Sequence, residues 1–558
     1  MRLRQLCLLT SVSFGAILFQ AGLQSGAQAQ SAAALTGTVS SQEEGNMEGV
    51  LVNARKEGSN ITVTVVSDDK GTYSFPADRL SPGKYTISIR ASGYDLVGPR
   101  AADVAAGGPA KADLKLAKTR NLVPKLSNAE WLNSLPGSDQ QKMFMINCVS
   151  CHTLQRVLTS THSAEEYEQV FKRMAKYAPG SVPARPQPLL PGPRGERPSV
   201  TGAAAKAAAE FLASVTLGNP DSTEYSFQTQ ARPKGRSTKV IITEYDLPRK
   251  EALPHDVIVD RDGMAWYSDF GSQFAGVLNP KTGEVKDIPI PVLKPEQPKG
   301  ALDIEFDRDQ NVWLSLMYQA GIGKIDRKTH EVTMYPFPKE WQSPSTQASM
   351  VSPQNSHVDG KVWTNNQEDH YSYRLDVKTG QFENVGQNFD PRGKRIRAYG
   401  MPTDLENNLY QLEFGGQSIG IRNAKTNQVT IYETPTKGSK PRRGRVDEHN
   451  RLWFAEYGAN AIALFDPKSA EIKEFKLPTK WGMPYDVVPA KGTAEVWTGS
   501  MLNDLVARLD TKSGQITEYL LPRTTNIRRV FVEETGPRPV LWVGSNHGAS
   551  IVKVEPLD

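Results

Sequence analysis

The sequence predicts a multidomain, mainly β protein that contains a small β-sandwich, an α-helical domain and a seven-bladed β-propeller. Three observations indicate this architecture. Residues 34–117 alternate apolar and polar side chains between frequent turns, residues 127–217 have helical patterns, and residues 237–558 repeat a unit of roughly 45 residues. The chain has 558 residues, which is long enough for several domains rather than one core.

The N-terminus has the features of an export signal. Arg2 and Arg4 precede an apolar run, and AQA at residues 27–29 is a small-x-small cleavage site, so residues 1–29 are predicted to be a signal peptide. The apolar run is shorter than the ~18 residues that a membrane anchor needs. We therefore expect a periplasmic or secreted protein with no membrane span. Its 66 basic and 61 acidic residues are too evenly balanced to indicate a nucleic-acid partner.

The predicted sandwich covers residues 34–117. Its alternating segments are separated by Gly, Asp and Pro turns about every 8–12 residues. The turn at residues 69–75 and the P-G-x-Y-x-I motif at residues 82–87 resemble the carboxypeptidase regulatory-like domain. The segment has no cluster of His or Cys, and this resemblance implies a scaffold or adhesion module.

The helical domain is predicted at residues 127–217. The stretches SNAEWLNSL and SAEEYEQVFKRM each begin with a Ser that can cap a helix, followed by acidic residues in the first turn. A proline-rich loop and the helix GAAAKAAAEFLASV follow.

The motif CVSCH lies within this segment and contains Cys148, Cys151 and His152. On a helix, positions i, i+3 and i+4 share one face, so two thiols can add to the vinyl groups of one haem while the imidazole binds its iron. A structural zinc site needs four ligands, a thioredoxin-like pair needs a βαβ context, and a simple disulfide leaves His152 without a role. The motif therefore predicts one covalently attached haem c, with His152 as the proximal iron ligand.

Together, the motif and the flanking helices resemble a monohaem cytochrome c domain. Such domains usually supply a methionine as the sixth iron ligand, and Met174 is the only methionine between the motif and the propeller. The resemblance therefore implies Met174 as the distal ligand, with a core position for this residue and ligation by His162 as the alternatives. A Met/His pair raises the reduction potential of a haem.

The propeller prediction rests on seven repeats, each with an aromatic signpost and about four short strands. The signposts are Trp266, Trp313, Trp363, Tyr410, Trp453, Trp497 and Trp542. The strand ITEYDLP at residues 242–248 precedes the first repeat and matches the ends of later ones. We expect it to complete the last blade and close the ring.

Two positions of the repeat are predicted to point toward the central channel. The first set is His255, Leu302, Tyr399, Arg442 or Arg443, Tyr485 and Arg529. The second set is Asp269, Leu316, Asn366, Glu413, Glu456, Ser500 and Ser545. These side chains are typical of a binding surface or an active site, and a solvated polar channel is the alternative.

The blade pattern P-x-x-I/V-x-x-D-x-x-G-x-x-W-F/Y resembles the virginiamycin B lyase family of seven-bladed propellers. The resemblance implies magnesium-dependent elimination across a cyclic ester, with His255 as general base, Asp269 as an acidic site residue and Glu456 in WFAEYGANAI as a third catalytic candidate. The chain departs from the family at two positions, where Leu253 and Arg529 replace a glutamate and a second histidine.

Three functions are compatible with these features. The first is haem-mediated electron transfer, in which the propeller binds a redox partner protein or a small-molecule donor. The second is a metal-dependent lyase acting in the propeller channel. The third is a non-catalytic sensor or surface-binding protein.

Overall fold

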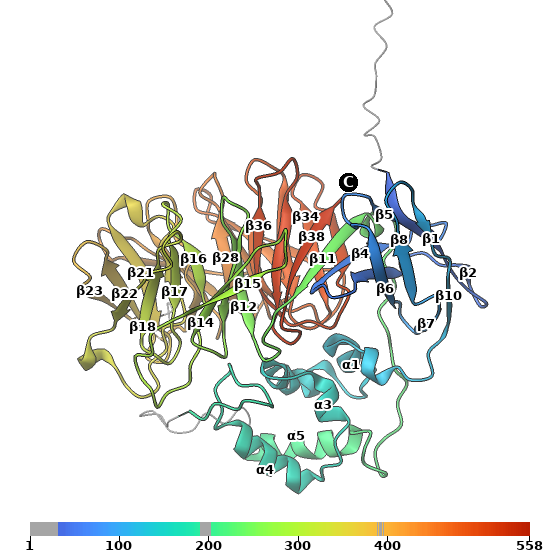
Figure 1. Cartoon of the computed structure of the whole chain (residues 1–558). Coiled ribbons are helices and arrows are strands. Elements are labelled where there is room, and N and C mark those ends of the chain that lie inside the picture. Colours follow the sequence, from blue (N-terminus) through green and yellow to red (C-terminus); the bar gives the residue numbers. More distant parts are fainter. Residues whose placement is uncertain (1–31, 190–201, 388, 390–392, 394) are drawn as a thin grey trace, which may run out of the picture.

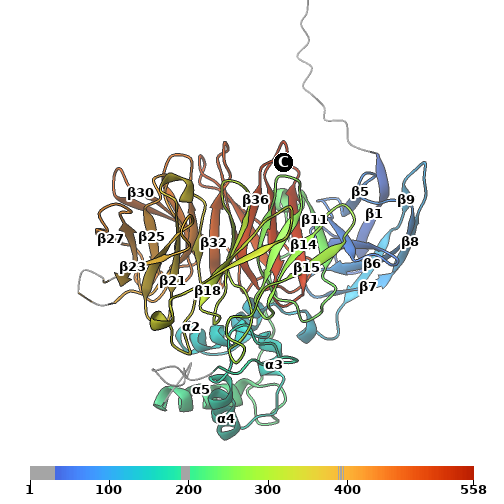
Figure 2. The ribbon, with the colours of Figure 1, turned by 60° about the vertical axis from the view of Figure 1, so that its left-hand side comes forward.

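A computed structural model describes residues 32–189, 202–387, 389, 393 and 395–558. The predicted signal peptide lies outside these residues. The sandwich stands beside the propeller, and the helices cover one end of the propeller (Figures 1 and 2). No helix of the described part of the chain is long and apolar enough to cross a membrane.

The N-terminal module is a β-sandwich, as the alternation predicted. One sheet has the order β2-β1-β10-β7, with β5 and β9 also paired to β1, and the other contains β4-β3-β6-β8. The strands are β1 (Ala33–Ser41), β2 (Gly45–Asn46), β3 (Leu51–Lys56), β4 (Ile61–Val66), β5 (Thr72–Pro76), β6 (Gly83–Arg90), β7 (Tyr94–Gly98), β8 (Ala101–Val104), β9 (Ala110–Lys111) and β10 (Leu114–Lys118).

The propeller has seven four-stranded blades. Blades 1 to 3 are β12 (Pro254–Val259), β13 (Ala265–Asp269), β14 (Phe274–Leu278), β15 (Val285–Pro289); β16 (Ile304–Phe306), β17 (Val312–Ser315), β18 (Gly321–Ile325), β19 (Val332–Pro336); and β20 (Val351–Ser352), β21 (Lys361–Asn366), β22 (Tyr371–Asp376), β23 (Phe382–Gln387). Blades 4 and 5 are β24 (Ala398–Gly400), β25 (Leu409–Glu413), β26 (Ser418–Arg422), β27 (Val429–Glu433); and β28 (Pro441–Val446), β29 (Leu452–Glu456), β30 (Ala461–Asp466), β31 (Glu471–Lys476). Blades 6 and 7 are β32 (Pro484–Pro489), β33 (Glu495–Ser500), β34 (Leu505–Asp510), β35 (Ile516–Leu520); and β36 (Ile527–Glu533), β37 (Val540–Ser545), β38 (Ser550–Pro556), β11 (Val240–Asp246).

The strand β11 closes the ring, as predicted, because it pairs with β38 along its whole length. Its other edge pairs with β4 of the sandwich, so blade 7 and one sandwich sheet form a single eight-stranded sheet. Figure 1 shows β11 between the two modules. The sandwich is therefore attached through backbone hydrogen bonds rather than through a flexible linker alone.

The repeated Asp and Trp of the blade pattern have a structural role. In blades 1, 2 and 5 the indole Nε1 of the signpost donates to the Asp six residues earlier, at 2.9 to 3.0 Å. The same Asp in blade 1, Asp260, also accepts the backbone N–H groups of Asp262 and Met264. The aspartate thus fixes the turn between two strands and satisfies a buried indole.

The α-helices of the described residues all lie between positions 128 and 215. They are α1 (Asn128–Ser134), α2 (Asp139–Lys142), α3 (Leu154–Leu158), α4 (Ala164–Met174) and α5 (Gly202–Val215). The 3₁₀ helices are η1 (Val123–Lys125), η2 (Met143–Ser150), η3 (Gly235–Thr238), η4 (Lys339–Trp341) and η5 (Ser356–Val358). Ser127 and Ser163 form capping boxes with Glu130 and Glu166, which explains where α1 and α4 begin.

The motif is not on one continuous helix, which corrects the sequence prediction. Cys148 lies in η2, which ends at Ser150, whereas Cys151 and His152 lie in the turn before α3. Thr153 has extended backbone angles as the residue that precedes α3, and this extended residue prevents η2 from continuing into α3.

The helical segment shares its core with the propeller. Trp131, Leu132 and Val149 belong to the same buried cluster as Tyr485 and Leu502 of the propeller. Part of the apolar surface of the helical segment is therefore covered by the end of the propeller, and the segment 127–217 has no core separate from that of the propeller.

Candidate functional site

The last propeller blade holds the segment between the two cysteines. The carbonyl oxygen of Val149 accepts hydrogen bonds from Asn526 Nδ2 at 3.3 Å and from His547 Nε2 at 3.0 Å. The carbonyl oxygen of Ser150 accepts one from Arg528 Nη2 at 3.2 Å. Three propeller side chains thus bind two successive carbonyl groups of the CVSCH motif, and they place it at the end of the central channel.

The residues of the motif have the donor chemistry that a covalently attached haem requires. Cys148 and Cys151 are not bridged to each other, and burial raises the pKa of both thiols, that of Cys148 to about 12. His152 Nδ1 is 3.1 Å from the carbonyl oxygen of Thr153, so Nδ1 carries the proton and Nε2 keeps its lone pair. Burial also lowers the pKa of His152, which favours the neutral ring that binds a metal. Two unbridged thiols and a neutral imidazole are the chemical groups that c-type haem attachment uses.

The two residues predicted as a sixth ligand lie away from the buried core. The Met174 side chain ends α4 and is 38% exposed, and it is not among the described side chains that pack on the cluster containing Val149. His162 is similarly exposed, pairs with Glu166 at 3.9 Å and stacks edge-on against Tyr167. The structure therefore does not bring either residue to the motif.

The inner strands of four blades carry a bulge at the same place. The register shifts fall at the dipeptides His255-Asp256, Arg442-Arg443, Tyr485-Asp486 and Arg528-Arg529. A bulge leaves residues unpaired and redirects their side chains. Here each bulge contributes one side chain to each of two layers in the channel, and Tyr399, Asp303, Glu305 and Arg445 complete the layers. The mouth layer, next to the helices, is His255, Tyr399, Arg442, Tyr485 and Arg528. The inner layer is Asp256, Asp303, Glu305, Arg443, Arg445, Asp486 and Arg529.

The inner layer is a network of buried ion pairs. Arg443 Nη1 lies 2.6 Å from Asp256 Oδ2 and 3.6 Å from Asp303 Oδ1. Arg529 lies 3.2 Å from Asp303 and 2.8 Å from Glu305, and Arg445 lies 2.7 Å from Glu305. Burial raises the pKa of Asp303 to about 7, whereas Arg443 and His255 outweigh burial at Asp256 and hold its pKa well below the usual range.

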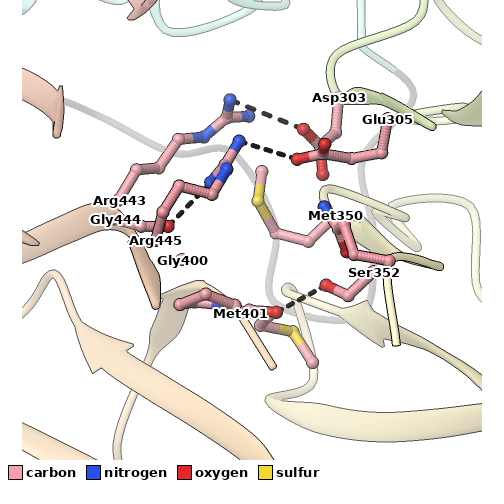
Figure 3. Close-up of a pocket in the computed structure, with 11 residues that line it drawn as sticks. Asp303, Glu305, Met350, Ser352, Gly400, Met401, Arg443, Gly444 and Arg445 are labelled. Carbon is pink, nitrogen blue, oxygen red and sulfur yellow. Dashed lines mark hydrogen bonds and ion pairs between the residues drawn. The ribbon is translucent and has the colours of Figure 1, made fainter. Parts of the chain in front are cut away.

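Figure 3 shows part of this network, from the side of a small cavity. Arg443 and Arg445 of blade 5 point across the cavity toward Asp303 and Glu305 of blade 2. The free volume is about 10 Å³, which is room for one water molecule. The inner layer therefore leaves room for little more than a water molecule beside these ion pairs.

The mouth layer is a hydrogen-bonded row of rings. His255 Nδ1 is 2.5 Å from Asp256, and its Nε2 is 3.3 Å from the hydroxyl of Tyr485, which in turn bonds the hydroxyl of Tyr399. Burial lowers the pKa of His255 to about 3, so its ring is neutral. Tyr399 and Tyr485 belong to the cluster that contains Val149, so this layer contacts the surroundings of the motif.

The three predicted catalytic residues have separate surroundings. Asp269 pairs with Arg249 at 2.6 Å and accepts the backbone N–H groups of Leu253 and Gly271, which are contacts of a structural turn. Glu456 interacts with Glu474 of an outer strand, and His255 interacts with Asp256 and Tyr485. Within the described residues, no three His, Cys, Asp or Glu side chains form a group that could hold a metal ion. The magnesium prediction thus gains no support from this geometry.

Glu456 makes the stability of the propeller depend on pH. Burial and then Glu474 raise its pKa to about 8, so the folded protein binds a proton that the unfolded chain releases at lower pH. Because the folded state holds more protons, stability falls as the pH rises from the ordinary Glu value toward 8. We expect Glu456→Gln to lose clearly less stability than the wild type between pH 6 and pH 9, and its remaining loss comes from other buried acids such as Asp303, whose pKa is about 7. An equal loss in Glu448→Gln and Glu456→Gln would contradict this assignment.

The repeat pattern predicted one side chain in three of the four bulged pairs and left the fourth open between Arg442 and Arg443. Its first set contains His255, Tyr399 and Tyr485 of the mouth layer and Arg529 of the inner layer, and it missed Asp256, Arg528 and Asp486. The signal was present in the repeat, since PHDVIV, PYDVV and IRRVFV align as two adjacent polar residues before an apolar run. The propeller donors Asn526 and His547 had no such signal.

Comparisons with known proteins agree with the two β modules. Residues 34–117 match the carboxypeptidase regulatory-like domain, and residues 290–557 match the virginiamycin B lyase family. No curated protein matches the chain. Among solved structures, selenomethionine-substituted virginiamycin B lyase from Staphylococcus aureus is 19% identical, covering 57% of this chain and 99% of its own, with a TM-score of 0.48. A streptogramin B lyase structure is 20% identical, covering 58% and 100%, also with a TM-score of 0.48.

Proposed function

We propose that this protein is an exported c-type cytochrome whose haem, held by Cys148, Cys151 and His152, exchanges electrons with a molecule bound at the propeller mouth. The observation that carries the proposal is the placement of the CVSCH motif. Its thiols are unbridged, its imidazole keeps Nε2 for a metal, and its carbonyl groups are bound by blade 7. Haem of the c type is attached outside the cytoplasm, and the export-signal pattern at the N-terminus agrees with this requirement.

The haem would supply a one-electron carrier, and the chain's own residues determine how it is held. Asn526, Arg528 and His547 fix the backbone between the two thiols, so the motif cannot shift relative to the mouth layer. The buried cluster that surrounds Val149 excludes water from the same region. Both effects favour electron transfer, because little rearrangement accompanies it. Reduced-minus-oxidised spectra of the exported protein test the proposal.

The alternatives have less support. In the lyase interpretation His255, Asp269 and Glu456 would act together, and each of them has its own local partners. In the sensor interpretation the sandwich would be a recognition module. Its sheet continues into blade 7 through β4 and β11, which supports a scaffold role.

The sixth iron ligand remains part of the proposal. Met174 could bind the iron only if the last turn of α4 rotated toward the motif, because its side chain is 38% exposed. If it is the ligand, Met174→Leu removes the weak long-wavelength band of a methionine–iron bond and lowers the reduction potential. The matched variant is Met501→Leu, because Met501 is buried in the cluster that contains Val149. Loss of the band in Met501→Leu alone would place the ligand in the propeller.

A further inference from the structure

Two buried arginines of the mouth layer have no carboxylate partner. Arg442 of β28 and Arg528 of β36 are 7% and 4% exposed, and neither forms an ion pair with any described residue. The next residue in each bulge, Arg443 or Arg529, forms ion pairs with carboxylates of the inner layer, although Nε of both and Nη2 of Arg443 have no hydrogen-bond partner among the described residues. In blades 5 and 7, the bulge thus places one guanidinium that has carboxylate partners next to one that has none.

The charges of the two layers do not balance. The inner layer has three arginines and four carboxylates, and the mouth layer adds two arginines and a neutral histidine. Five arginines, of which Arg445 is partly exposed, therefore face four carboxylates, and burial raises the pKa of Asp303 to about 7, which weakens the negative side further. A buried charge is stable only when it is paired. At least one positive charge lacks a partner, and it lies at the end of the channel that faces Cys148 and Cys151.

The neighbours of Arg442 compensate its charge only in part. Its Cζ atom lies over the rings of Tyr485 at 3.6 Å, Phe414 at 4.3 Å and Tyr457 at 4.5 Å. Ring faces attract a cation, but more weakly than a carboxylate does in a dry site. Its Nε atom has no hydrogen-bond acceptor among the described residues. The guanidinium thus keeps an unused donor inside an aromatic enclosure.

Arg528 connects this enclosure to the motif. Its Cζ atom lies 5.6 Å from the centre of the Tyr485 ring, and its Nη2 binds the carbonyl oxygen of Ser150. The neighbouring turn of blade 7 contains further buried atoms without a described partner, namely Nδ1 of His547 and both amide atoms of Asn546. Although burial opposes ionisation, Arg442, Arg443 and Arg528 lower the pKa of Tyr485. The whole junction is therefore electropositive and has spare hydrogen-bonding capacity.

We propose that Arg442 and Arg528 form a carboxylate-binding site between the propeller mouth and the CVSCH motif. The planar, forked guanidinium matches a carboxylate, and the walls of tyrosine and phenylalanine suit an apolar or aromatic body. The carboxylate belongs either to a small organic acid that exchanges electrons with the haem or to a propionate of the haem. The proposal deepens the proposed function by naming the class of ligand, but the unpaired arginines do not depend on haem attachment.

The test is calorimetric titration of the full chain with benzoate, with benzamide as its neutral equivalent. We expect benzoate to bind and benzamide not to bind. Arg442→Gln and Arg528→Gln should each weaken benzoate at least about tenfold, because each removes a charge-assisted contact. Arg451→Gln is the control, since Arg451 pairs with Asp447 on the surface. Equal binding of benzamide, or unchanged affinity in Arg442→Gln, overturns the proposal.

The source of the carboxylate is decided by comparing haem-bearing protein with the Cys148→Ser/Cys151→Ser variant. Binding of benzoate to both supports a free organic acid, and binding to the serine variant alone supports the haem propionate. If the serine variant does not fold, the haem midpoint potential of Arg442→Gln is compared with that of the wild type instead. A shift in this potential supports the haem propionate. No binding together with an unshifted potential overturns the proposal. A tyrosinate absorbance at neutral pH that Tyr485→Phe removes also overturns the proposal. Tyr485 would then be the anion that balances the charge of the two arginines.

These outcomes are separable from a failure of the proposed function. If the wild-type protein carries no haem, the cytochrome proposal fails. The titration of the same protein with benzoate still decides whether the arginine pair binds a carboxylate.

Discussion

We expect the Cys148→Ser/Cys151→Ser variant to carry no covalent haem when it is produced in a host that attaches c-type haem. The wild type, produced in the same host, should retain haem on a denaturing gel. The physical reason is that the two thiols are the groups that form the thioether bonds, and the described residues contain no other cysteine. The measurement is haem-linked peroxidase staining together with a reduced-minus-oxidised spectrum. This is the largest effect expected from the proposed function, because the variant would lack the proposed redox group completely.

Ser150→Ala is the matched control. It changes the same short segment but keeps both thiols, His152 and the backbone carbonyl that Arg528 binds. Full haem content in the control and none in the serine variant support attachment at CVSCH. Covalent haem in the double-serine variant would end the cytochrome proposal, and the two remaining functions would then have to be separated by ligand binding to the propeller.

Arg443→Met destabilises the propeller by about 3–5 kcal/mol, which is the second large effect. Arg443 is 1% exposed and is the closest charged partner of Asp256, because the nearer His255 ring is neutral. Its removal leaves this buried carboxylate with only Arg529, at 3.8 Å, to compensate it. The measurement is urea unfolding of the full chain, followed by tryptophan fluorescence, because the blade tryptophans report on the propeller. Arg451→Met, which breaks a partly exposed pair with Asp447, should cost less than about 1 kcal/mol.

A second substitution makes this prediction specific. Asp303→Asn in the Arg443→Met background removes one carboxylate of the overloaded network, so we expect it to restore part of the lost stability. The pKa of Asp303, raised to about 7, indicates that burial already disfavours the charge of this carboxylate. If Arg443→Met costs no more than Arg451→Met, the buried ion pairs are not what holds the inner layer together.

The modular architecture was predictable because each module has a local pattern. Alternation with a period of two specifies the sandwich strands, and a signpost such as Trp453 recurs because its indole needs the Asp447 acceptor six residues earlier. The capping boxes at Ser127 and Ser163 specify helix starts for the same reason, since their hydrogen bonds span three residues. Closure by β11 was predictable because its sequence repeats that of other outer strands.

The site was only partly predictable. The channel residues His255 and Tyr485 were found because they recur at one position of the repeat. Their neighbours Asp256 and Asp486 were missed because a regular strand would point adjacent residues to opposite faces, and the bulge overrides that rule. Asp269 was assigned to the channel by resemblance, but Arg249 binds it elsewhere.

By itself, the sequence determined the export signal pattern, the three segments and the chemistry of Cys148, Cys151 and His152. These are properties of residues that are close together along the chain. Only the tertiary structure decided that blade 7 binds the motif, since Val149 and His547 are brought together from 398 positions apart. It likewise decided that Arg443 is paired and Arg442 is not, because the pairing of a buried charge depends on which carboxylates the other blades bring to it.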